Sequence, residues 1–381
     1  MRIQGGQALV GGQFVAADIV FEETDGKISA VGAEGGNGRS FDAHGLYVLP
    51  GIVDIHGDAF ERQLMPRPGV GFPIDVALME SDRQCVSNGI TTVYHGVTGS
   101  WEPGLRSMAN ARAILDAMEG LQTSLGADTR FHLRYEAFNL DAEAEVTEWI
   151  AKSRIGMLGF NDHLPGPNTP PRTRKIAQMA ERAGLSPEDF VALVERLRGR
   201  ADEVPGSVAR LAAAAGANAT PMLSHDDTSP EQRRWFRALD CRLAEFPTTV
   251  ETAQDATAAG DDIVLGAPNV VRGGSHIGWI GAADMIARGC CTILASDYYY
   301  PAPLLAAFQL AADGVVPLQQ AWSYVSSRPA KAAGLDDRGA LESGRRADVI
   351  VVDASDARRP KLVAAIANGR LVHLVDAQRL R

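Results

Sequence analysis

The sequence predicts an α/β fold, a TIM-like (β/α)₈ barrel, joined to a small β-sandwich domain. Eight apolar runs alternate with longer amphipathic stretches over residues 50–335. This alternation is typical of parallel βαβ units, and eight such units fit a closed barrel. Short strand-like runs occupy both ends of the chain, and because domain termini often lie close together, they favour one sandwich domain made from residues 1–49 and 336–381. An open doubly wound sheet is the alternative, but its glycine-rich turn after the first strand is missing from the sequence.

The terminal segments consist of short apolar runs separated by glycine or polar residues. Asp25-Gly26 and Asn368-Gly369 are turn dipeptides that predict β-hairpins. The strands expected in these segments are Gln7–Val10, Gln13–Ala16, Ile19–Phe21, Lys27–Val31, Val349–Asp353, Leu362–Ile366 and Leu371–Val375.

The barrel segment yields eight strands and the helices between them. The expected strands are Ile52–His56, Thr91–His95, Phe131–Glu136, Ile155–Phe160, Thr220–Ser224, Ala244–Thr248, Asp262–Leu265 and Thr292–Ser296. The expected helices are Asp75–Ser87, Gly104–Thr123, Glu143–Lys152, Arg174–Ala215 with a break near Gly184, Gln232–Cys241, Glu251–Ala259, Ile280–Ala287 and Ala302–Ala311.

The composition is that of an ordinary globular protein and excludes several classes. Of 381 residues, 45% are hydrophobic and 22% are charged, and the net charge of -10 does not favour nucleic acid or an anionic membrane as a partner. No apolar run approaches the ~20 residues of a membrane-spanning helix, and no secretory signal is visible. Four cysteines without CxxC spacing predict buried thiols in a reducing compartment. We expect a cytoplasmic protein with a small-molecule partner, and a homodimer is the common default.

The first barrel strand ends in two side chains that bind metals well. His56 and Asp58 are two positions apart, so in a strand they point to the same face. An imidazole and a carboxylate that converge at a strand end make half of a divalent-metal site. The alternative is a hydrogen-bonded histidine beside a turn aspartate.

Later strands end in the same kinds of residue. Barrel enzymes place their catalytic groups at the C-terminal ends of the strands. Imidazoles and carboxylates without thiols suit Zn²⁺, with Mn²⁺ or Fe²⁺ as alternatives, so the sequence predicts one or two divalent metal ions. The expected ligands are His56, Asp58, Glu136, His163, His225 and Asp297.

Two of these residues also have predicted catalytic roles. Glu136 is the best candidate to bridge two metals, which in such sites lie roughly 3.5–4 Å apart. Asp297, at the end of strand eight, is positioned to take a proton from the attacking water.

The roles of three neighbouring residues stay open. His95 follows a strand and is either a ligand or a packing residue. Asp162 is either part of the site or the cap of the next segment, and one member of the Asp226-Asp227 pair has the same capping alternative.

Two loops add positive charge to the same barrel mouth. Arg67 lies in the proline-rich stretch Met65-Pro66-Arg67-Pro68-Gly69, and Arg272 precedes two glycines, Ser275 and His276. Arginines with exposed backbone amides bind phosphate, and barrels often bind phosphate near the loops after strands seven and eight. The alternative is that each arginine lies on a flexible surface loop.

Longer motifs resemble a known family. The chain resembles the amidohydrolase superfamily and, more narrowly, the PhnM family of phosphonate-metabolism proteins. The motifs that carry this resemblance are 49-LPGIVDIH-56, 65-MPRPGV-70, 162-DHLPG-166, 224-SHDD-227, 245-EFPTT-249, 266-GAPNVVRGGSH-276, 296-SDYY-299 and 344-GRRADV-349.

The resemblance implies a reaction and a substrate class. It implies metal-dependent hydrolysis of α-D-ribose 1-methylphosphonate 5-triphosphate to the 5-phosphate and pyrophosphate, in the carbon–phosphorus lyase pathway. The substrate-binding residues expected on this basis and from the two cationic loops are Arg67, Arg272, Ser275, His276 and Asp226.

The sequence departs from the family pattern in two places. Strand one reads His56-Gly57-Asp58 instead of His-x-His, and no lysine stands where a carboxylated lysine would bridge two metals. After Gly166 the family's Gln-Arg-Gln-aromatic stretch is replaced by 167-PNTPPR-172. Two other functions therefore stay open: an amidohydrolase acting on a C–N bond, and a non-catalytic subunit of the phosphonate pathway.

Overall fold

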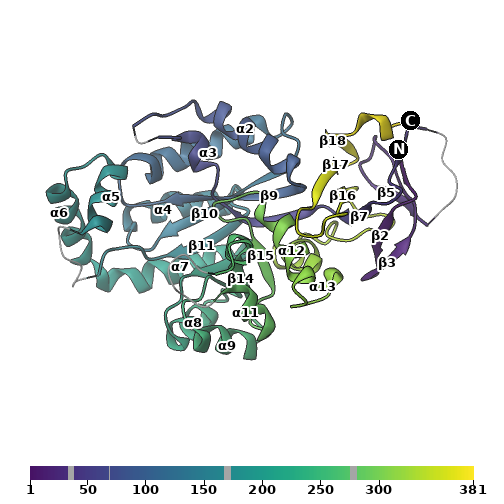
Figure 1. The fold of residues 1–381 in the computed structure, drawn as a ribbon. Helices are drawn as coiled ribbons and strands as arrows, with labels where there is room; N and C mark the ends of the chain where they lie inside the picture. Colours follow the sequence, from purple (N-terminus) through teal and green to yellow (C-terminus); the bar gives the residue numbers. More distant parts are fainter. Residues whose placement is uncertain (33–37, 68, 167–172, 275–280) are drawn as a thin grey trace.

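An eight-stranded parallel sheet forms the centre of the computed structural model (Figure 1), which describes residues 1–32, 38–67, 69–166, 173–274 and 281–381. Its strands follow one another in chain order, and nearly all of their residues are buried, as expected when helices cover the outer face. The barrel prediction is confirmed. The strands are β8 (Ile52–Gly57), β9 (Ile90–Gly99), β10 (Asp128–Glu136), β11 (Met157–Asn161), β12 (Met222–His225), β13 (Leu243–Glu245), β14 (Asp262–Gly266) and β15 (Ile293–Ala295).

The barrel closes between β8 and β15 only at their C-terminal ends. There the amide of Asp297 donates to the carbonyl of His56 at 2.8 Å, and the amide of Asp58 donates to the carbonyl of Asp297 at 3.0 Å. Closer to their N-terminal ends, each of the two strands is hydrogen-bonded instead to the Tyr324–Val325 segment. The hydrogen bonds that complete the barrel therefore also hold the ends of strands one and eight together.

Helices surround the sheet, and several begin with a side-chain cap. Ser107, Ser229 and Thr249 each accept a hydrogen bond from the third following amide. The long helices that pack on the barrel are α2 (Ile74–Ser87), α3 (Met108–Leu121), α4 (Glu143–Ala151), α7 (Val204–Ala217), α8 (Pro230–Ala238), α9 (Val250–Ala258) and α12 (Ala302–Ala312). Shorter helices are α1 (Glu61–Leu64), α10 (Ala267–Val271), α11 (Ala282–Ala287), α13 (Leu318–Ser323) and α14 (Ser327–Ala332).

The segment predicted as helix over Arg174–Ala215 is divided twice. The predicted break is present, because Gly184 ends α5 (Arg174–Ala183) with φ of 68° and Ser186 caps α6 (Pro187–Arg198). The second break, over residues 199–203 before α7, is not in the sequence prediction. Helices α5 and α6 form a hairpin at the end of the molecule opposite the chain termini (Figure 1).

The two chain termini together build a β-sandwich, as predicted. One sheet has the order β5-β4-β1-β6, and the other, β18-β17-β16-β7-β2-β3, mixes strands from both ends of the chain. The N- and C-termini accordingly lie side by side in Figure 1. The strands are β1 (Arg2–Gln4), β2 (Gln7–Val10), β3 (Gln13–Ala16), β4 (Ile19–Phe21), β5 (Ile28–Val31), β6 (Ser40–Asp42), β7 (Tyr47–Pro50), β16 (Val349–Asp353), β17 (Lys361–Ala367) and β18 (Arg370–Leu374).

Buried polar contacts connect the sandwich to the barrel. The indole of Trp322 donates to the carbonyl of Pro50 at 3.1 Å, at the end of β7. Arg338, which follows α14, donates to Asp128 at 2.6 Å and to Thr92 at 2.8 Å. Within the described ranges, no helix combines the length and the apolar character that crossing a bilayer requires.

Candidate metal centre

The centre of the site is a buried contact between strands one and six. His56 ends β8 and Glu245 ends β13, and Nδ1 of His56 lies 2.7 Å from Oε1 of Glu245. Both side chains are almost fully buried, at 1% and 0% exposed. Burial acts to raise the pKa of Glu245, but the neighbouring His56 and His225 lower it to about 2. Glu245 is therefore a carboxylate held in its charged form inside the barrel.

The structure brings most of the predicted ligands together at this rim. Among the described residues, three groups have possible ligand atoms within 4.8 Å of one another. His56 is shared by two of these groups, so the ends of β8, β13 and β15 and the inner part of β10 converge on one place. The groups are His56 with Asp58 and Asp297, His163 with His225 and Asp226, and His56 with His132 and Glu245.

The backbone has an unusual conformation at three residues near the ends of barrel strands. Asp226, Phe246 and Asp297 have φ of 58°, 53° and 53°, in the left-handed region that residues other than glycine rarely adopt. Asp226 and Phe246 follow directly after β12 and β13, and Asp297 lies two residues after the end of β15. Such conformations cost free energy and cluster at functional sites. Burial and the nearby Asp58 carboxylate also raise the pKa of Asp297 to about 7.

Glu136 contacts His163 with both of its carboxylate oxygens. Oε1 lies 2.6 Å from Nδ1 of His163, and Oε2 accepts the backbone N–H of His163 at 3.0 Å. Burial acts to lower the pKa of His163, but Asp226 and Glu136 raise it to about 9. A carboxylate on one ring nitrogen leaves the other nitrogen for a metal, which is the usual way of orienting a histidine ligand. In this arrangement Glu136 orients His163.

Sequence reasoning missed three residues of the site. Glu245 ends β13 (Leu243–Glu245), but the predicted strand, Ala244–Thr248, placed it near the start of strand six. His132 and Arg134 precede Glu136 by four and two positions on β10, so all three point to one face of the strand. Arg134 is 6% exposed, lies 3.4 Å from Asp58 and donates to Nε2 of His225 at 3.2 Å. The alternation along β10 could have identified both residues.

The donor set fits a divalent metal ion. It consists of imidazole nitrogens and carboxylate oxygens without a thiol, which suits Zn²⁺, Mn²⁺ or Fe²⁺. Oε2 of Glu245 is buried and has no hydrogen-bond partner among the described residues. Because leaving a buried charged oxygen unpaired costs free energy, a cation beside it would stabilise the site.

The two arginines predicted for substrate binding lie on exposed loops. Arg67 is exposed on the loop after α1, and Arg272 is exposed after α10, where it donates to the hydroxyl of Tyr298 at 3.1 Å. The guanidinium of Arg62 lies 5.7 Å from the centre of the same tyrosine ring. Ser275 and His276, the other predicted substrate contacts, lie outside the described residues.

The residues with open roles have structural partners. His95 is buried against Phe60, and burial lowers its pKa to about 4. Asp162 accepts the backbone N–H of Leu164 at 3.1 Å. Asp227 lies 3.1 Å from the buried Arg233.

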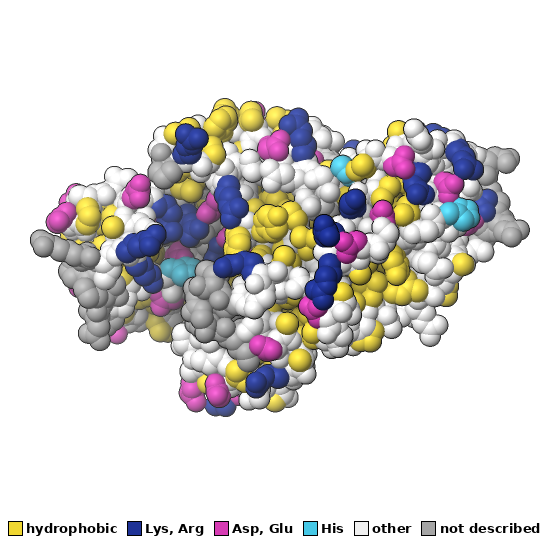
Figure 2. Space-filling view, viewed as in Figure 1, with side chains coloured by type: hydrophobic (Ala, Val, Ile, Leu, Met, Phe, Trp, Pro, Cys, Tyr) yellow, Lys and Arg dark blue, Asp and Glu magenta, His cyan; other side chains and the backbone are white. Residues whose placement is uncertain are grey.

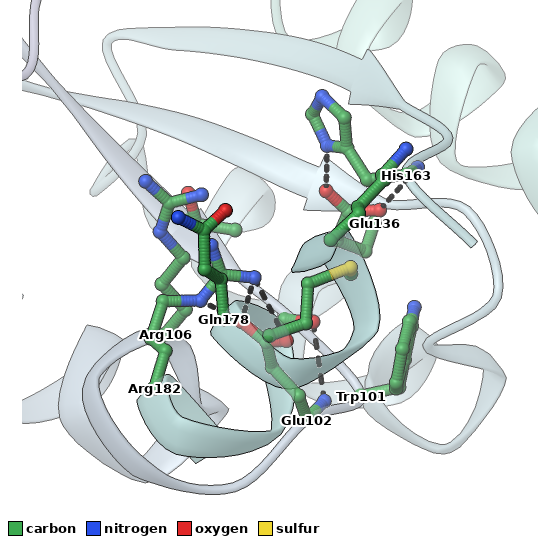
Figure 3. Close-up of a pocket in the computed structure, with 11 residues that line it drawn as sticks. Trp101, Glu102, Arg106, Glu136, His163, Gln178 and Arg182 are labelled. Atoms are coloured by element: carbon green, nitrogen blue, oxygen red, sulfur yellow. Dashed lines mark hydrogen bonds and ion pairs between the residues drawn. The ribbon is translucent and has the colours of Figure 1, made fainter. Parts of the chain in front are cut away.

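A cavity of about 230 Å³ opens directly from the centre (Figure 3). Glu136 and His163 lie on one side of it, and Arg106, Gln178 and Arg182 lie on the other. Figure 2 shows lysine and arginine side chains grouped around a histidine in a hollow beside the α5–α6 end of the molecule. A negatively charged group bound near the metal ligands would therefore face several cations.

The sequence is similar to known hydrolases, although no family model matches it. An alpha-D-ribose 1-methylphosphonate 5-triphosphate diphosphatase of Escherichia coli strain K12 is 31% identical over 332 residues, covering 84% of this chain and 86% of that protein. An adenine deaminase of Methylobacterium nodulans is 26% identical over 347 residues, covering 88% of this chain and 51% of the deaminase.

The fold is similar to that of cyclic amide hydrolases. The crystal structure of dihydropyrimidinase from Brevibacillus agri NCHU1002 aligns with a TM-score of 0.66 at 12% identity, covering 98% of this chain and 95% of that one. A D-hydantoinase from Bacillus sp. AR9 aligns with a TM-score of 0.67 at 13% identity and the same coverage. At these identities the similarity concerns the fold alone.

Proposed function

Because this chain belongs to the PhnM family of the amidohydrolase superfamily, we propose that it hydrolyses α-D-ribose 1-methylphosphonate 5-triphosphate in phosphonate catabolism. Water adds across one phosphoanhydride: its oxygen bonds to the phosphorus on the sugar oxygen, and the bond from that phosphorus to the bridging oxygen breaks. The products are the 5-phosphate and pyrophosphate. The Escherichia coli relative is named for this substrate and matches most of both chains, which supports the proposal.

One observation carries the phosphoanhydride chemistry. The histidine–carboxylate centre opens into a cavity whose lining includes Arg106, Lys175 and Arg182, so a reacting group bound there has three cationic side chains nearby. Positive side chains aimed at developing negative charge stabilise a phosphoryl-transfer transition state. A neutral amide substrate would gain little from them.

The proposed metal ligands come from the ends of five strands and their loops. They are His56, Asp58, His163, His225 and Asp297, with Glu245 added by its position between two of the histidines. Glu136 either joins them or orients His163. A divalent ion, with zinc the first candidate and manganese or iron the alternatives, would supply Lewis-acid activation of water and of the phosphoryl oxygens.

The chain's own residues would orient the reactants and move a proton. Asp297 Oδ accepts the proton of the attacking water, because it lies beside His56 at the closing point of the barrel. Asp226, Arg67 and Arg272 contact the substrate, and Ser275 and His276 belong to the same proposed substrate-binding set.

A second candidate function is hydrolysis of a C–N bond. The similarity to adenine deaminase covers 88% of this chain, and the fold is that of cyclic amide hydrolases. The same metal ligands would serve that reaction, so the two functions differ in what the cavity binds.

An assay with matched substrates separates the two functions. Purified protein loaded with Zn²⁺ or Mn²⁺ is incubated with the ribose methylphosphonate triphosphate, adenine and a hydantoin, and pyrophosphate, ammonia and the ring-opened hydantoin are measured. We expect pyrophosphate from the triphosphate only, and a His225→Ala variant should lose this activity.

Two results would contradict the proposal. Ammonia release from adenine, or ring opening of the hydantoin, without pyrophosphate formation would assign the centre to C–N hydrolysis. Protein that binds almost no metal even after expression with Zn²⁺ would indicate a non-catalytic subunit.

A further inference from the structure

We propose that the cavity beneath α5 is the subsite for the pyrophosphate leaving group, and that Lys175 is its principal binding cation. This assignment rests on the proposed hydrolysis of a triphosphate. It goes beyond that function by specifying which end of the substrate enters this cavity and which residue of the α5–α6 hairpin binds that end.

The cavity has the position that a leaving group requires. Glu136 and His163 form its inner wall, so it begins at the metal ligands themselves. It shares Gln178 and Arg182 with a larger outer cavity of about 770 Å³, which is also lined by Arg62 and Arg67. The two cavities are therefore neighbours, with the side chains of Gln178 and Arg182 between them.

The cations of the inner cavity differ in how they are paired. Arg106 makes two hydrogen bonds to Glu61, at 3.0 and 2.8 Å, and Arg182 makes two to Glu102, at 2.8 and 3.0 Å. These carboxylates fix both arginines and neutralise much of their charge. Lys175 is exposed on the first turn of α5, and no described carboxylate lies within ion-pair distance of it. Among the described residues that line this cavity, Lys175 is thus the lysine or arginine whose charge no carboxylate neutralises.

The remaining polar groups are mostly donors. Thr98 is 4% exposed, and its hydroxyl is buried without a hydrogen-bond partner among the described residues. The indole N–H of Trp101 is also buried without one. Gln178 adds an amide at the junction of the two cavities. An oxyanion accepts hydrogen bonds from all of these groups, because phosphoryl oxygens are acceptors only.

A sugar would fit the same wall poorly. Ribose hydroxyl groups both donate and accept hydrogen bonds, but the two carboxylates that line this cavity, Glu102 and Glu136, are already bound to Arg182 and His163. The phosphonate end of the substrate would then lie toward Arg272 and Tyr298, on the β14–β15 side of the centre. The substrate is thereby oriented across the metal site, with its diphosphate end under α5.

Calorimetric titration of the metal-loaded protein tests this assignment without requiring turnover. The variants are Lys175→Ala, Lys175→Arg and, as the matched control, Arg174→Ala, an exposed cation of the same helical turn that does not line the cavity. The ligands are inorganic pyrophosphate and methylphosphonate. Bound metal is measured for each variant, so that a difference in metal content is recognised.

We expect Lys175→Ala to weaken pyrophosphate binding by about tenfold, the usual effect of losing one charged hydrogen bond. Lys175→Arg should restore most of the affinity, and Arg174→Ala should bind as the unchanged protein does. Methylphosphonate affinity should be the same in all of them. Equal pyrophosphate affinity in Lys175→Ala and the unchanged protein would overturn the assignment, as would equal weakening of both ligands.

The two proposals fail in different ways. If the protein released no pyrophosphate from the ribose triphosphate, the proposed function would fall, while the titrations would still show whether Lys175 binds pyrophosphate. If turnover were intact and Lys175→Ala bound pyrophosphate normally, only the subsite would be wrong.

Discussion

Glu245 is the carboxylate on which we expect the metal centre to depend most. It contacts His56 at 2.7 Å, and its second oxygen lies 3.9 Å from Nε2 of His225. Replacing Glu245 by Gln keeps the size of the side chain but removes its charge. We expect the affinity for the metal to fall by about 10–100-fold, as when partners of metal ligands are lost, and hydrolysis to fall with it. Metal content and turnover of the purified variant measure both effects.

The matched control for this change is Glu119→Gln. Glu119 is 51% exposed and is paired with Arg154 on the surface, away from the centre. That variant should keep its metal and its activity. Full metal content and full turnover in Glu245→Gln would show instead that Glu245 only packs against His56.

Single residues of the site were predictable where a strand end could be recognised in the sequence. His56, His225 and Asp297 follow apolar runs, and the barrel fold then requires them to meet. His132 and Arg134 were not recognised, because they lie within β10 and not at its end, and their alternation with Glu136 was not used. The contact of Glu136 with His163 depends on the path of the loop after β11, which the sequence does not specify.

The α5–α6 hairpin is an element whose stability we expect to be partly independent of the barrel. Ile176, Met179, Phe190 and Val194 form a small core of their own, against Trp101. Phe190 is fully buried in it, and a buried Phe→Ala change costs about 3–5 kcal/mol. In Phe190→Ala we expect this cost to loosen the hairpin, so that the KM for the triphosphate rises while metal content stays unchanged. Limited proteolysis and steady-state kinetics measure these effects.

A phenylalanine of the barrel provides the comparison. Phe236 of α8 belongs to the large core that also contains Phe160 and Leu211. Phe236→Ala should lower the unfolding temperature of the whole protein without making the hairpin selectively sensitive to protease. If Phe190→Ala produced only that global effect, the hairpin would not be a separate unit.

Elements were predictable in proportion to their length. The long helices have the expected positions because their apolar periodicity extends over several turns. The break at residues 199–203 was missed, although Gly199 begins it and Pro205 stands in the first turn of α7. Strands such as β1 and β6 have only three residues each, and their pairing with each other, not a local pattern, makes them strands.

At the scale of the whole molecule, the similar character of the two termini predicted one shared sandwich. The pairing of individual strands could not be predicted from the character of the termini. The sheet order joins β16 to β7, and the barrel closes through only a few hydrogen bonds between β8 and β15. These pairings connect residues about 240 to 300 positions apart, as with Gly57 and Asp297 or Pro50 and Val349, so no local pattern specifies them.

The buried contact of Arg338 with Asp128 makes the connection of sandwich and barrel dependent on pH. Burial acts to raise the pKa of Asp128, but Arg130 and Arg338 hold it below its usual value of 3.8. Because the folded-state pKa is lowered, the charged carboxylate stabilises the protein at every pH above about 4, and this contribution is lost as the pH falls through the folded-state pKa. Removing one partner of such a pair costs about 3 kcal/mol.

We therefore expect Asp128→Asn to lower the free energy of unfolding by about 3 kcal/mol at pH 7 and by progressively less below pH 4, where the unchanged protein loses the same contribution. Urea unfolding of both proteins between pH 7 and pH 3 measures the difference. Asp116→Asn, which removes a 58% exposed partner of Arg154, should have little effect at any pH. A difference between Asp128→Asn and the unchanged protein that stayed constant down to pH 3 would mean that the amide disturbs packing, and that the charge of Asp128 does not connect the two parts of the molecule.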